Sequence, residues 1–284
     1  MAVERVQANG IEIAFEAVGD PADPPLVLIH GISRQLIDWR DEFLAALAGR
    51  GLRVVRFDNR DAGESTHLDD SGPGYTLSDM AADTAGLIDA LGHDSAHVVG
   101  VSMGGMIAQT LAIEHPDRVR SLTSVMSTTG DSEVGQATPE AQAVLLAPPP
   151  RDRDEAVALR LRSQRVIGSP GFDRDEDWIA ENAVRAYERA FDPAGVRRQF
   201  AAIIASGNRT DRLRGLRVPT LVLHGEDDPL IGVSGGRATA AAIPGAELVT
   251  IAGMGHDLPR GAWERIIDPI AALVERVERE RVPA

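Results

Sequence analysis

The stretch Ala96-His97-Val98-Val99-Gly100-Val101-Ser102-Met103-Gly104 decides how this sequence is interpreted. Its apolar first half is typical of a strand that is covered on both faces, and a helical pattern follows it. Between them lies G-x-S-x-G, a motif whose glycines are needed because a Cβ in so tight a strand-to-helix turn would collide with neighbouring backbone. The pattern predicts a strained turn that exposes the Oγ of Ser102 as a nucleophile.

Working outward, seven further runs have the apolar or alternating pattern of strands: residues 3–8, 11–18, 26–29, 53–57, 122–126, 220–223 and 247–251. The first two flank Asn9-Gly10, which predicts a tight antiparallel hairpin. Helical periodicity fills residues 39–50, 77–91 and 104–115. Because strands alternate with helices, the chain is predicted to be an α/β protein with a mostly parallel eight-stranded sheet flanked by helices.

The alternation breaks once, between residues 128 and 217, where no strand pattern occurs. There the chain passes Ala147-Pro148-Pro149-Pro150 and enters a charged, helical stretch. The sequence therefore predicts a core domain of residues 1–127 and 218–284, with residues 128–217 as a helical cap inserted over the sheet. Its aromatic residues either line an apolar pocket or fill the core of the cap: Phe172, Trp178, Tyr187, Phe191 and Phe200.

Composition narrows the class of partner. The 284 residues are 43% hydrophobic, enough for a sizeable core, and their formal net charge of -14 comes without any run of Lys or Arg. Nucleic acids and anionic membrane surfaces are therefore poor partners, and a small molecule is expected instead. Whether the protein is a monomer or a homodimer is left open.

Targeting and cofactor signals are missing from the sequence. No cysteine occurs, the N-terminal residues lack the basic and apolar regions of a signal peptide, and no apolar run approaches the roughly 20 residues that span a bilayer. A cytoplasmic protein is predicted. Neither a dinucleotide-binding G-x-G-x-x-G after a strand nor a phosphate-binding loop is present, so we expect no cofactor and no metal.

A serine hydroxyl needs a base, and seven histidines are available. His256 is the predicted base because it lies in Gly253-Met254-Gly255-His256-Asp257, a loop that follows the last strand and is rich in small residues. For any single histidine a structural role is the default, which is how we interpret the other six: His30, His67, His93, His97, His115 and His224.

The third member of the relay must be a carboxylate that orients the imidazole. The turn His224-Gly225-Glu226-Asp227-Asp228-Pro229 follows a strand and offers three. Asp228 is the preferred one because Pro229 favours an extended conformation at the preceding residue. Asp227, Glu226 and the more distant Asp131 stay open as alternatives.

Two backbone amides are predicted to bind the oxyanion of a tetrahedral intermediate. Met103 follows the nucleophile at the N-terminus of a helix, where amides and dipole favour negative charge. Ile32 follows His30-Gly31 in the loop after an earlier strand, at the same end of the sheet.

On these residues the sequence resembles the α/β-hydrolase superfamily along nearly its whole length, the inserted segment excepted. Further pieces of the likeness are Asp58-Asn59-Arg60-Asp61-Ala62-Gly63-Glu64-Ser65, a loop that in the family is usually a structural brace, and Gly255-His256. Within the superfamily, residues 53–58, 102–104 and 253–259 look like bacterial esterases of the aclacinomycin methylesterase group.

The resemblance implies a serine hydrolase that cleaves a carboxylic ester of a small, moderately hydrophobic substrate through an acyl-enzyme on Ser102. Carbon–carbon hydrolase, lactonase, thioesterase and cofactor-free perhydrolase chemistry stay open on the same scaffold, although Ile32 replaces the aromatic residue common in perhydrolase-like members. Haloalkane dehalogenases and epoxide hydrolases use an aspartate where Ser102 stands. A catalytically silent ligand-binding protein is the alternative of another class.

Overall fold

The computed structural model describes residues 2–69, 72 and 74–281. Eight strands form one sheet in the order β1-β2-β4-β3-β5-β6-β7-β8, and only the pairings of β1 with β2 and of β2 with β4 are antiparallel. The mostly parallel eight-stranded sheet predicted from the sequence is therefore confirmed. The strands are β1 (Glu4–Ala8), β2 (Ile11–Val18), β3 (Pro25–Ile29), β4 (Arg53–Phe57), β5 (Ala96–Val101), β6 (Val119–Val125), β7 (Thr220–Gly225) and β8 (Glu247–Ile251).

The predicted strands agree with the observed ones apart from their ends, the largest difference being β6. This strand begins at Val119, before the apolar run from Leu122, because its first residues pair with the start of β5. The hairpin at Asn9-Gly10 is present, with φ of 48° and 79° at the two residues. Positive φ at both central residues is the geometry of a two-residue turn that matches the twist of its strands.

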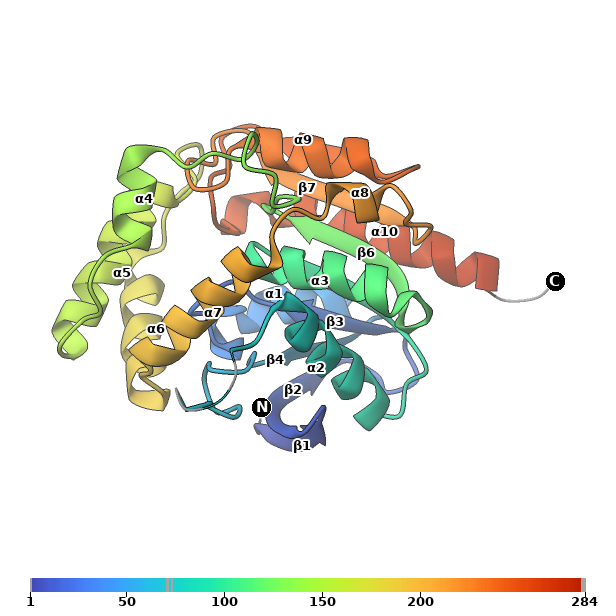
Figure 1. Ribbon diagram of the computed structural model, residues 1–284, viewed down its shortest axis with the longest axis horizontal. Helices are drawn as coiled ribbons and strands as arrows, with labels where there is room; N and C mark the ends of the chain where they lie inside the picture. The colour runs from blue at the N-terminus through green and yellow to red at the C-terminus, as the bar shows by residue number, and fades with distance from the viewer. Residues whose placement is uncertain (1, 70–71, 73, 282–284) are drawn as a thin grey trace.

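Helices cover both faces of the sheet (Figure 1). On one face, α2 (Leu77–Ala90), α3 (Met103–Glu114) and α9 (Val233–Ala242) pack on side chains such as Val27 and Val98. On the other face, α1 (Asp41–Ala48) and α10 (Trp263–Arg281) pack on their strand neighbours, such as Leu28 and Val99. Successive strand residues thus enter opposite apolar layers, which explains why the central strands are continuous apolar runs.

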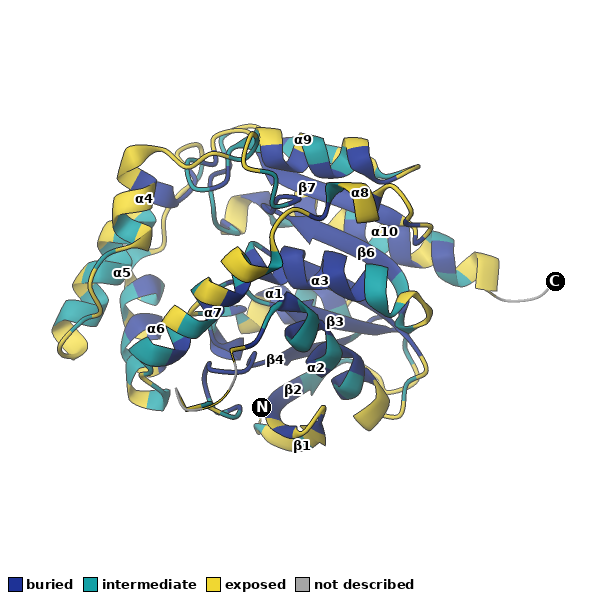
Figure 2. Ribbon diagram, in the orientation of Figure 1, coloured by how far each residue is buried: buried dark blue, intermediate teal, exposed yellow. Residues whose placement is uncertain are grey.

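Between β6 and β7 the chain forms five helices and, among the described residues, no strand: α4 (Pro139–Leu145), α5 (Arg153–Ile167), α6 (Glu176–Arg189), α7 (Pro193–Ser206) and α8 (Thr210–Leu213). In Figure 1, α4 to α7 gather at the left, beyond the end of the sheet. Figure 2 shows α4 and α5 mostly teal and yellow, whereas the central strands are dark blue. The helical character of this segment is as the sequence predicts, and the cap boundaries at residues 128 and 217 stay a prediction.

The strand order brings four loops to one edge of the sheet. Strands β3, β5, β7 and β8 run parallel, so the loops that follow them all leave from their carboxyl ends. In open α/β sheets this edge is where ligands bind. Across the described residues, no helix combines the length and apolar character needed to cross a bilayer.

Candidate active site

Ser102 stands at the turn between β5 and α3 with φ 58° and ψ -121°, a conformation that L-residues rarely adopt. The flanking glycines make the turn possible. A Cβ at Gly100 would lie 2.1 Å from the carbonyl oxygen of Gly104, and a Cβ at Gly104 would lie 2.1 Å from that of Ile29. At Gly105 it would press on the Ser127 side chain at 2.5 Å. The backbone strain is therefore held by close packing of the strand, the turn and the helix.

The structure brings the side chains of Ser102, His256 and Asp228 together. Nε2 of His256 lies 3.0 Å from the Oγ of Ser102, and its Nδ1 lies 2.7 Å from Oδ2 of Asp228. The second carboxylate oxygen, Oδ1, accepts hydrogen bonds from the backbone amides of Leu230 at 2.8 Å and Ile231 at 2.9 Å. These amides fix the carboxylate, which in turn fixes the imidazole ring, so both ring nitrogens lie within hydrogen-bond reach of the groups that a proton relay needs.

The other carboxylates considered from the sequence have separate partners. Oδ2 of Asp227 accepts from the amide of Gly253 at 2.8 Å, and Oε1 of Glu226 accepts from the hydroxyl of Thr250 at 2.7 Å. Asp131 closes its own turn by accepting from the amide of Glu133. The structure therefore brings Asp228 to the imidazole and places the three alternatives elsewhere.

Two of the remaining histidines, His97 and His224, are fully buried, and His30 is half-buried at the edge of the cavity. Burial, followed by the charges of Arg34 and His256, lowers the pKa of His30 well below its usual value. His224 donates from Nε2 to the carbonyl of Ile231 at 2.7 Å, and burial lowers its pKa. Burial also lowers the pKa of His97 to about 4. These rings are neutral near pH 7 and belong to packing and hydrogen bonding.

Two amides face the same edge as Ser102. The N–H groups of Ile32 and Met103 have no hydrogen-bond acceptor among the residues that the structure describes. A Cβ at Gly31, beside Ile32, would lie 3.1 Å from the Cβ of Ser102, so this loop passes directly over the Ser102 side chain. The first turn of α3 and the loop after β3 thus offer two free donors close to the hydroxyl.

Sequence reasoning missed the residue that holds this loop. Oε1 of Gln199, on α7, accepts from the amide of Ser33 at 2.9 Å, and its Nε2 donates to the carbonyl of Arg60 at 2.8 Å. The Gln199 side chain is fully buried, and Ser33 has a φ of 61°. A polar residue on the otherwise apolar face of a helix was the only signal in the sequence.

The inserted helices also hold the histidine loop. The amide of His256 donates to the carbonyl of Ile167 at 2.7 Å, and the amide of Gly255 donates to Oγ of Ser169 at 2.9 Å. The Asp257 carboxylate accepts from the Ser169 hydroxyl and from Nε2 of Gln164. The glycines permit this approach, since a Cβ at Gly255 would lie 2.4 Å from the carbonyl oxygen of Gly168.

The loop of residues 58–65 is a brace, as the family resemblance implies. Asp58 is fully buried and accepts from the amides of Leu36 at 2.6 Å and Glu64 at 2.9 Å. Its Oδ2 also lies 2.7 Å from Nη1 of Arg189 on α6. The loop therefore ties the core to the inserted helices beside the candidate site.

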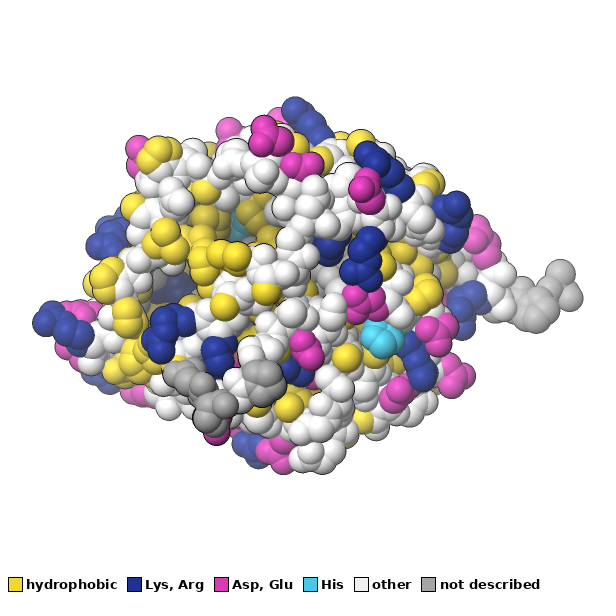
Figure 3. All heavy atoms as spheres, in the orientation of Figure 1, with side chains coloured by type: hydrophobic (Ala, Val, Ile, Leu, Met, Phe, Trp, Pro, Cys, Tyr) yellow, Lys and Arg dark blue, Asp and Glu magenta, His cyan; other side chains and the backbone are white. Residues whose placement is uncertain are grey.

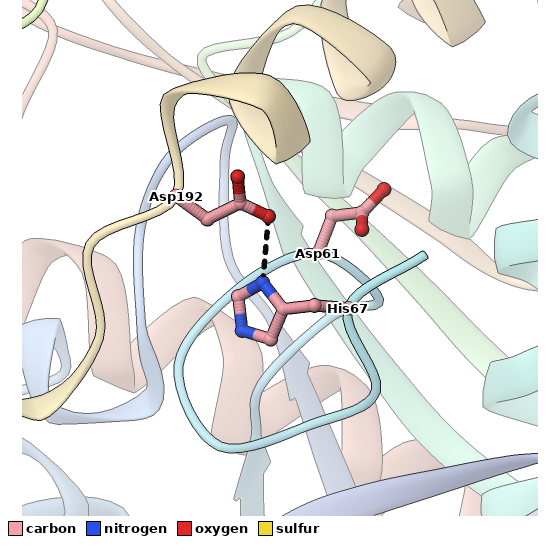
Figure 4. Close-up of side chains that lie close together, drawn as sticks. All are labelled: Asp61, His67 and Asp192. Atoms are coloured by element: carbon pink, nitrogen blue, oxygen red, sulfur yellow. Dashed lines mark hydrogen bonds and ion pairs between the residues drawn. The ribbon is translucent and has the colours of Figure 1, made fainter. Parts of the chain in front are cut away.

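Figure 4 shows Asp61 and His67 from this loop region converging with Asp192 at the start of α7. Nδ1 of His67 lies 2.8 Å from Oδ2 of Asp192. The guanidinium of Arg198 donates to both oxygens of Asp61 at 2.9 Å and contacts Asp192 at 3.2 Å. Because a guanidinium already occupies these carboxylate oxygens, the cluster is an ion-pair network, and we assign no metal to it.

A cavity of about 1110 Å³ opens over Ser102 and His256. Of the five aromatic residues singled out in the insertion, four line it (Trp178, Tyr187, Phe191 and Phe200), whereas Phe172 packs on the core. Four large apolar side chains at its rim are also exposed: Leu145, Leu146, Phe191 and Ile204. Figure 3 shows hydrophobic side chains gathered around this hollow on the left of the molecule.

Comparisons with known proteins identify the fold family. The alpha/beta hydrolase fold family matches residues 24–259. The chain is 30% identical to "Rhodomycin D methylesterase DauP" of Streptomyces sp. (strain C5), over 96% of this chain and 97% of that protein. The crystal structure of "an esterase RhEst1 from Rhodococcus sp. ECU1013" is 25% identical, with a TM-score of 0.78 over 98% of this chain and all of that one. The structure titled "Est816 as an N-Acyl homoserine lactone degrading enzyme" is 28% identical, with a TM-score of 0.69 over 98% and 99%.

Proposed function

The chain belongs to the alpha/beta hydrolase fold family, and on that premise we propose that it is a serine hydrolase that cleaves carboxylic esters through an acyl-enzyme. The observation that carries the proposal is the hydrogen-bonded series Ser102, His256 and Asp228, with spacings of 3.0 and 2.7 Å. These side chains come from three loops at the carboxyl edge of one sheet, which is the geometry of nucleophilic catalysis by a serine.

In the proposed reaction, Oγ of Ser102 attacks the ester carbonyl while Nε2 of His256 takes its proton. Asp228, held by the amides of Leu230 and Ile231, keeps the imidazole in the correct tautomer and stabilises the imidazolium. The protonated His256 then gives the proton to the departing alkoxide, so that the alcohol leaves and the acyl-serine remains. Water, deprotonated by the same nitrogen, releases the acid and restores Ser102.

We assign the amides of Ile32 and Met103 to the oxyanion of the two tetrahedral intermediates. Neither N–H has an acceptor within the part of the chain that the structure describes, and both lie beside Ser102, one in the loop after β3 and one in the first turn of α3. Each such donor contributes about 3 kcal/mol to transition-state stabilisation in comparable sites.

We further propose a substrate larger than the small one expected from the sequence, with a mainly apolar acyl part and with residues 128–217 acting as the cap that encloses it. The cavity of about 1110 Å³ exceeds what a short ester fills, and aromatic side chains from α6 and α7 line it. A methylesterase among the relatives supports a small alcohol as leaving group. A lactone is the second candidate, favoured by the likeness to the lactone-degrading enzyme, because its cyclic ester needs the same attack and proton transfer.

The test is covalent labelling combined with turnover. A fluorophosphonate should add to Ser102, as mapped by peptide mass spectrometry, and Ser102→Ala should lose both the label and the hydrolysis of p-nitrophenyl and methyl esters. Labelling at another residue overturns the assignment of the nucleophile. Ligand-induced stabilisation without labelling and without turnover would instead identify a binding protein.

A further inference from the structure

One wall of the cavity carries two arginines that share a single carboxylate. Asp38 is the last residue of the short helix η1 (Leu36–Asp38) and lies next to the loop that passes over Ser102. Its Oδ1 accepts from Nη1 of Arg160 at 2.8 Å, from Nδ2 of Asn182 at 3.1 Å and from Nη1 of Arg34 at 3.5 Å. Its Oδ2 accepts from the amide of Gln35 at 2.8 Å.

These bonds leave positive charge unmatched. Four donors use up the acceptor positions of the Asp38 carboxylate, whereas each guanidinium has five N–H groups. Within residues 2–69, 72 and 74–281, neither Arg34 nor Arg160 has another side-chain hydrogen bond or ion pair. The Asp38 side chain is only 4% exposed, but those of Arg34 and Arg160 are 23% and 20% exposed, and all three line the cavity. The group formed by Arg34, Arg160 and Asp38 therefore carries one excess positive charge and free donors at the cavity wall, while the carboxylate of Asp257 in the same lining is bonded to Ser169 and Gln164.

Two comparisons within the protein set this pair apart. Two other arginines of the cavity wall have a carboxylate of their own: Arg40 contacts Asp175 at 2.6 Å, and Arg260 contacts Glu42 at 2.9 Å. Arg197, also in the wall, donates to the carbonyl of Pro193 at 3.4 Å, farther along the chain from the loop over Ser102. The whole chain has a formal net charge of -14, so its overall field repels anions. An anion drawn into this cavity would have to be attracted locally, and the arginines that share Asp38 lie next to the loop that passes over Ser102.

We infer that Arg34 and Arg160 form a subsite for a carboxylate carried by the substrate, so that the enzyme prefers half-esters of dicarboxylic acids to the corresponding neutral esters. The planar guanidinium matches a carboxylate and binds it with two parallel hydrogen bonds. Arg34 lies close to Ser102. Its amide donates to the carbonyl of Gly31 at 3.3 Å, and Gly31 packs against Ser102. The inference rests on the proposed ester hydrolysis and names its substrate class.

The test compares pairs of esters that differ only in charge. Mono-p-nitrophenyl esters of succinic, adipic and suberic acid are each measured against the ester with a terminal carboxamide. For at least one chain length, kcat/KM should favour the carboxylate, and the preferred length reports the distance from Ser102 to the subsite. Arg160→Gln and Arg34→Gln should each reduce that preference about tenfold, the worth of a hydrogen bond to a charged group. The preference of Arg160→Lys for the carboxylate ester should lie between that of the two Gln variants and that of the unaltered enzyme.

Arg260→Gln is the matched control, because it removes a cavity arginine that has its own carboxylate, and it should keep the original preference. Thermal unfolding of each variant checks that the fold survives. Arg34 and Arg160 lie on different elements. If one of the two Gln variants has a folding defect, the other variant still tests the subsite. Equal kcat/KM for both members of every pair, or a preference that neither substitution changes, refutes the subsite.

Calorimetry with the acid products separates the two proposals. Suberic acid should bind more tightly than its monoamide to Ser102→Ala, and Arg160→Gln in that background should abolish the difference. If no ester is turned over but this difference is present, ester hydrolysis fails while the subsite stands. If esters are turned over and the difference is absent, the subsite alone fails.

Discussion

The backbone N–H of His256 donates a 2.7 Å hydrogen bond to the carbonyl oxygen of Ile167, the last residue of α5. The proposed catalytic base is thus held by the inserted helices as well as by Asp228. Together with the contact of Gly255 with Ser169, this bond makes the position of the imidazole depend on the position of the segment that follows α5. The placement of the inserted helices and the geometry of the proposed relay are therefore coupled, and the next two substitutions test this coupling.

Ser169→Ala removes the acceptor of the Gly255 amide and one donor to Asp257. We expect kcat to fall about tenfold, with a smaller change in KM, because a looser histidine loop weakens proton transfer more than substrate binding. Steady-state kinetics on one ester measures this. Ser163→Ala, on α5 just before this segment and without a side-chain hydrogen bond among the described residues, serves as the control. Equal kcat for both variants would show that the coupling has no catalytic effect.

Gln199→Leu should lower kcat by about tenfold, because the Ser33 amide would lose its acceptor beside the proposed oxyanion donor Ile32. The effect should be similar for esters with different leaving groups, since the donor acts on the oxyanion in both steps. Gln142→Leu, on an exposed part of α4, is the comparison. A variant with normal kcat and a lowered melting temperature would assign Gln199 to stability alone.

Asp228→Asn should reduce kcat about 10⁴-fold while leaving the fold intact, because an amide favours the wrong tautomer of the imidazole. Glu226→Gln, two residues earlier and with a side chain that bonds only Thr250 among the described residues, should stay near the activity of the unaltered protein. Rates on a p-nitrophenyl ester decide this. A mild effect at Asp228 with a severe one at Glu226 would transfer the role to the other carboxylate.

His67 should make stability depend on pH. Burial opposes its charged form, but the carbonyl of Gly63 and the carboxylates of Asp192 and Asp61 outweigh it and raise its pKa above 6.5. The folded protein therefore holds this proton more tightly than the unfolded chain does. The stabilisation is complete below about pH 6.5 and disappears as the pH rises through the raised pKa of the folded state.

Melting temperatures of His67→Gln across pH test this expectation. The variant should be less stable than the unaltered protein in mildly acidic buffer, and the difference should shrink in alkaline buffer. Asp192→Asn should remove most of the same pH dependence. The double variant His67→Gln, Asp192→Asn should change the pH dependence little further, because the two residues act as one pair. Asp192→Asn also removes the contact with Arg198. A difference that is constant over pH would mean that the ion pair contributes no net stability.

The strained strand-to-helix turn at Ser102 could be predicted because all of its causes are local. The strand, the two glycines and the start of α3 are contiguous, so residues 96–104 carry the whole signal. The choice among Glu226, Asp227 and Asp228, by contrast, depends on residues far away in the sequence. These neighbours share one turn, and their partners, Thr250, Gly253 and His256, come from β8 and the loop after it.

By itself, then, the sequence determined the alternation of strands and helices, the strained turn at Ser102 and the loop that carries His256, because each follows from neighbouring residues and their periodicity. Only the tertiary structure decided which faces of the inserted helices meet the core. It thereby placed Gln199 on the loop of Ile32, Ile167 on the amide of His256, and Arg160 beside Arg34. Such contacts join residues 89 or more positions apart, and a helical pattern without a motif does not specify its partner.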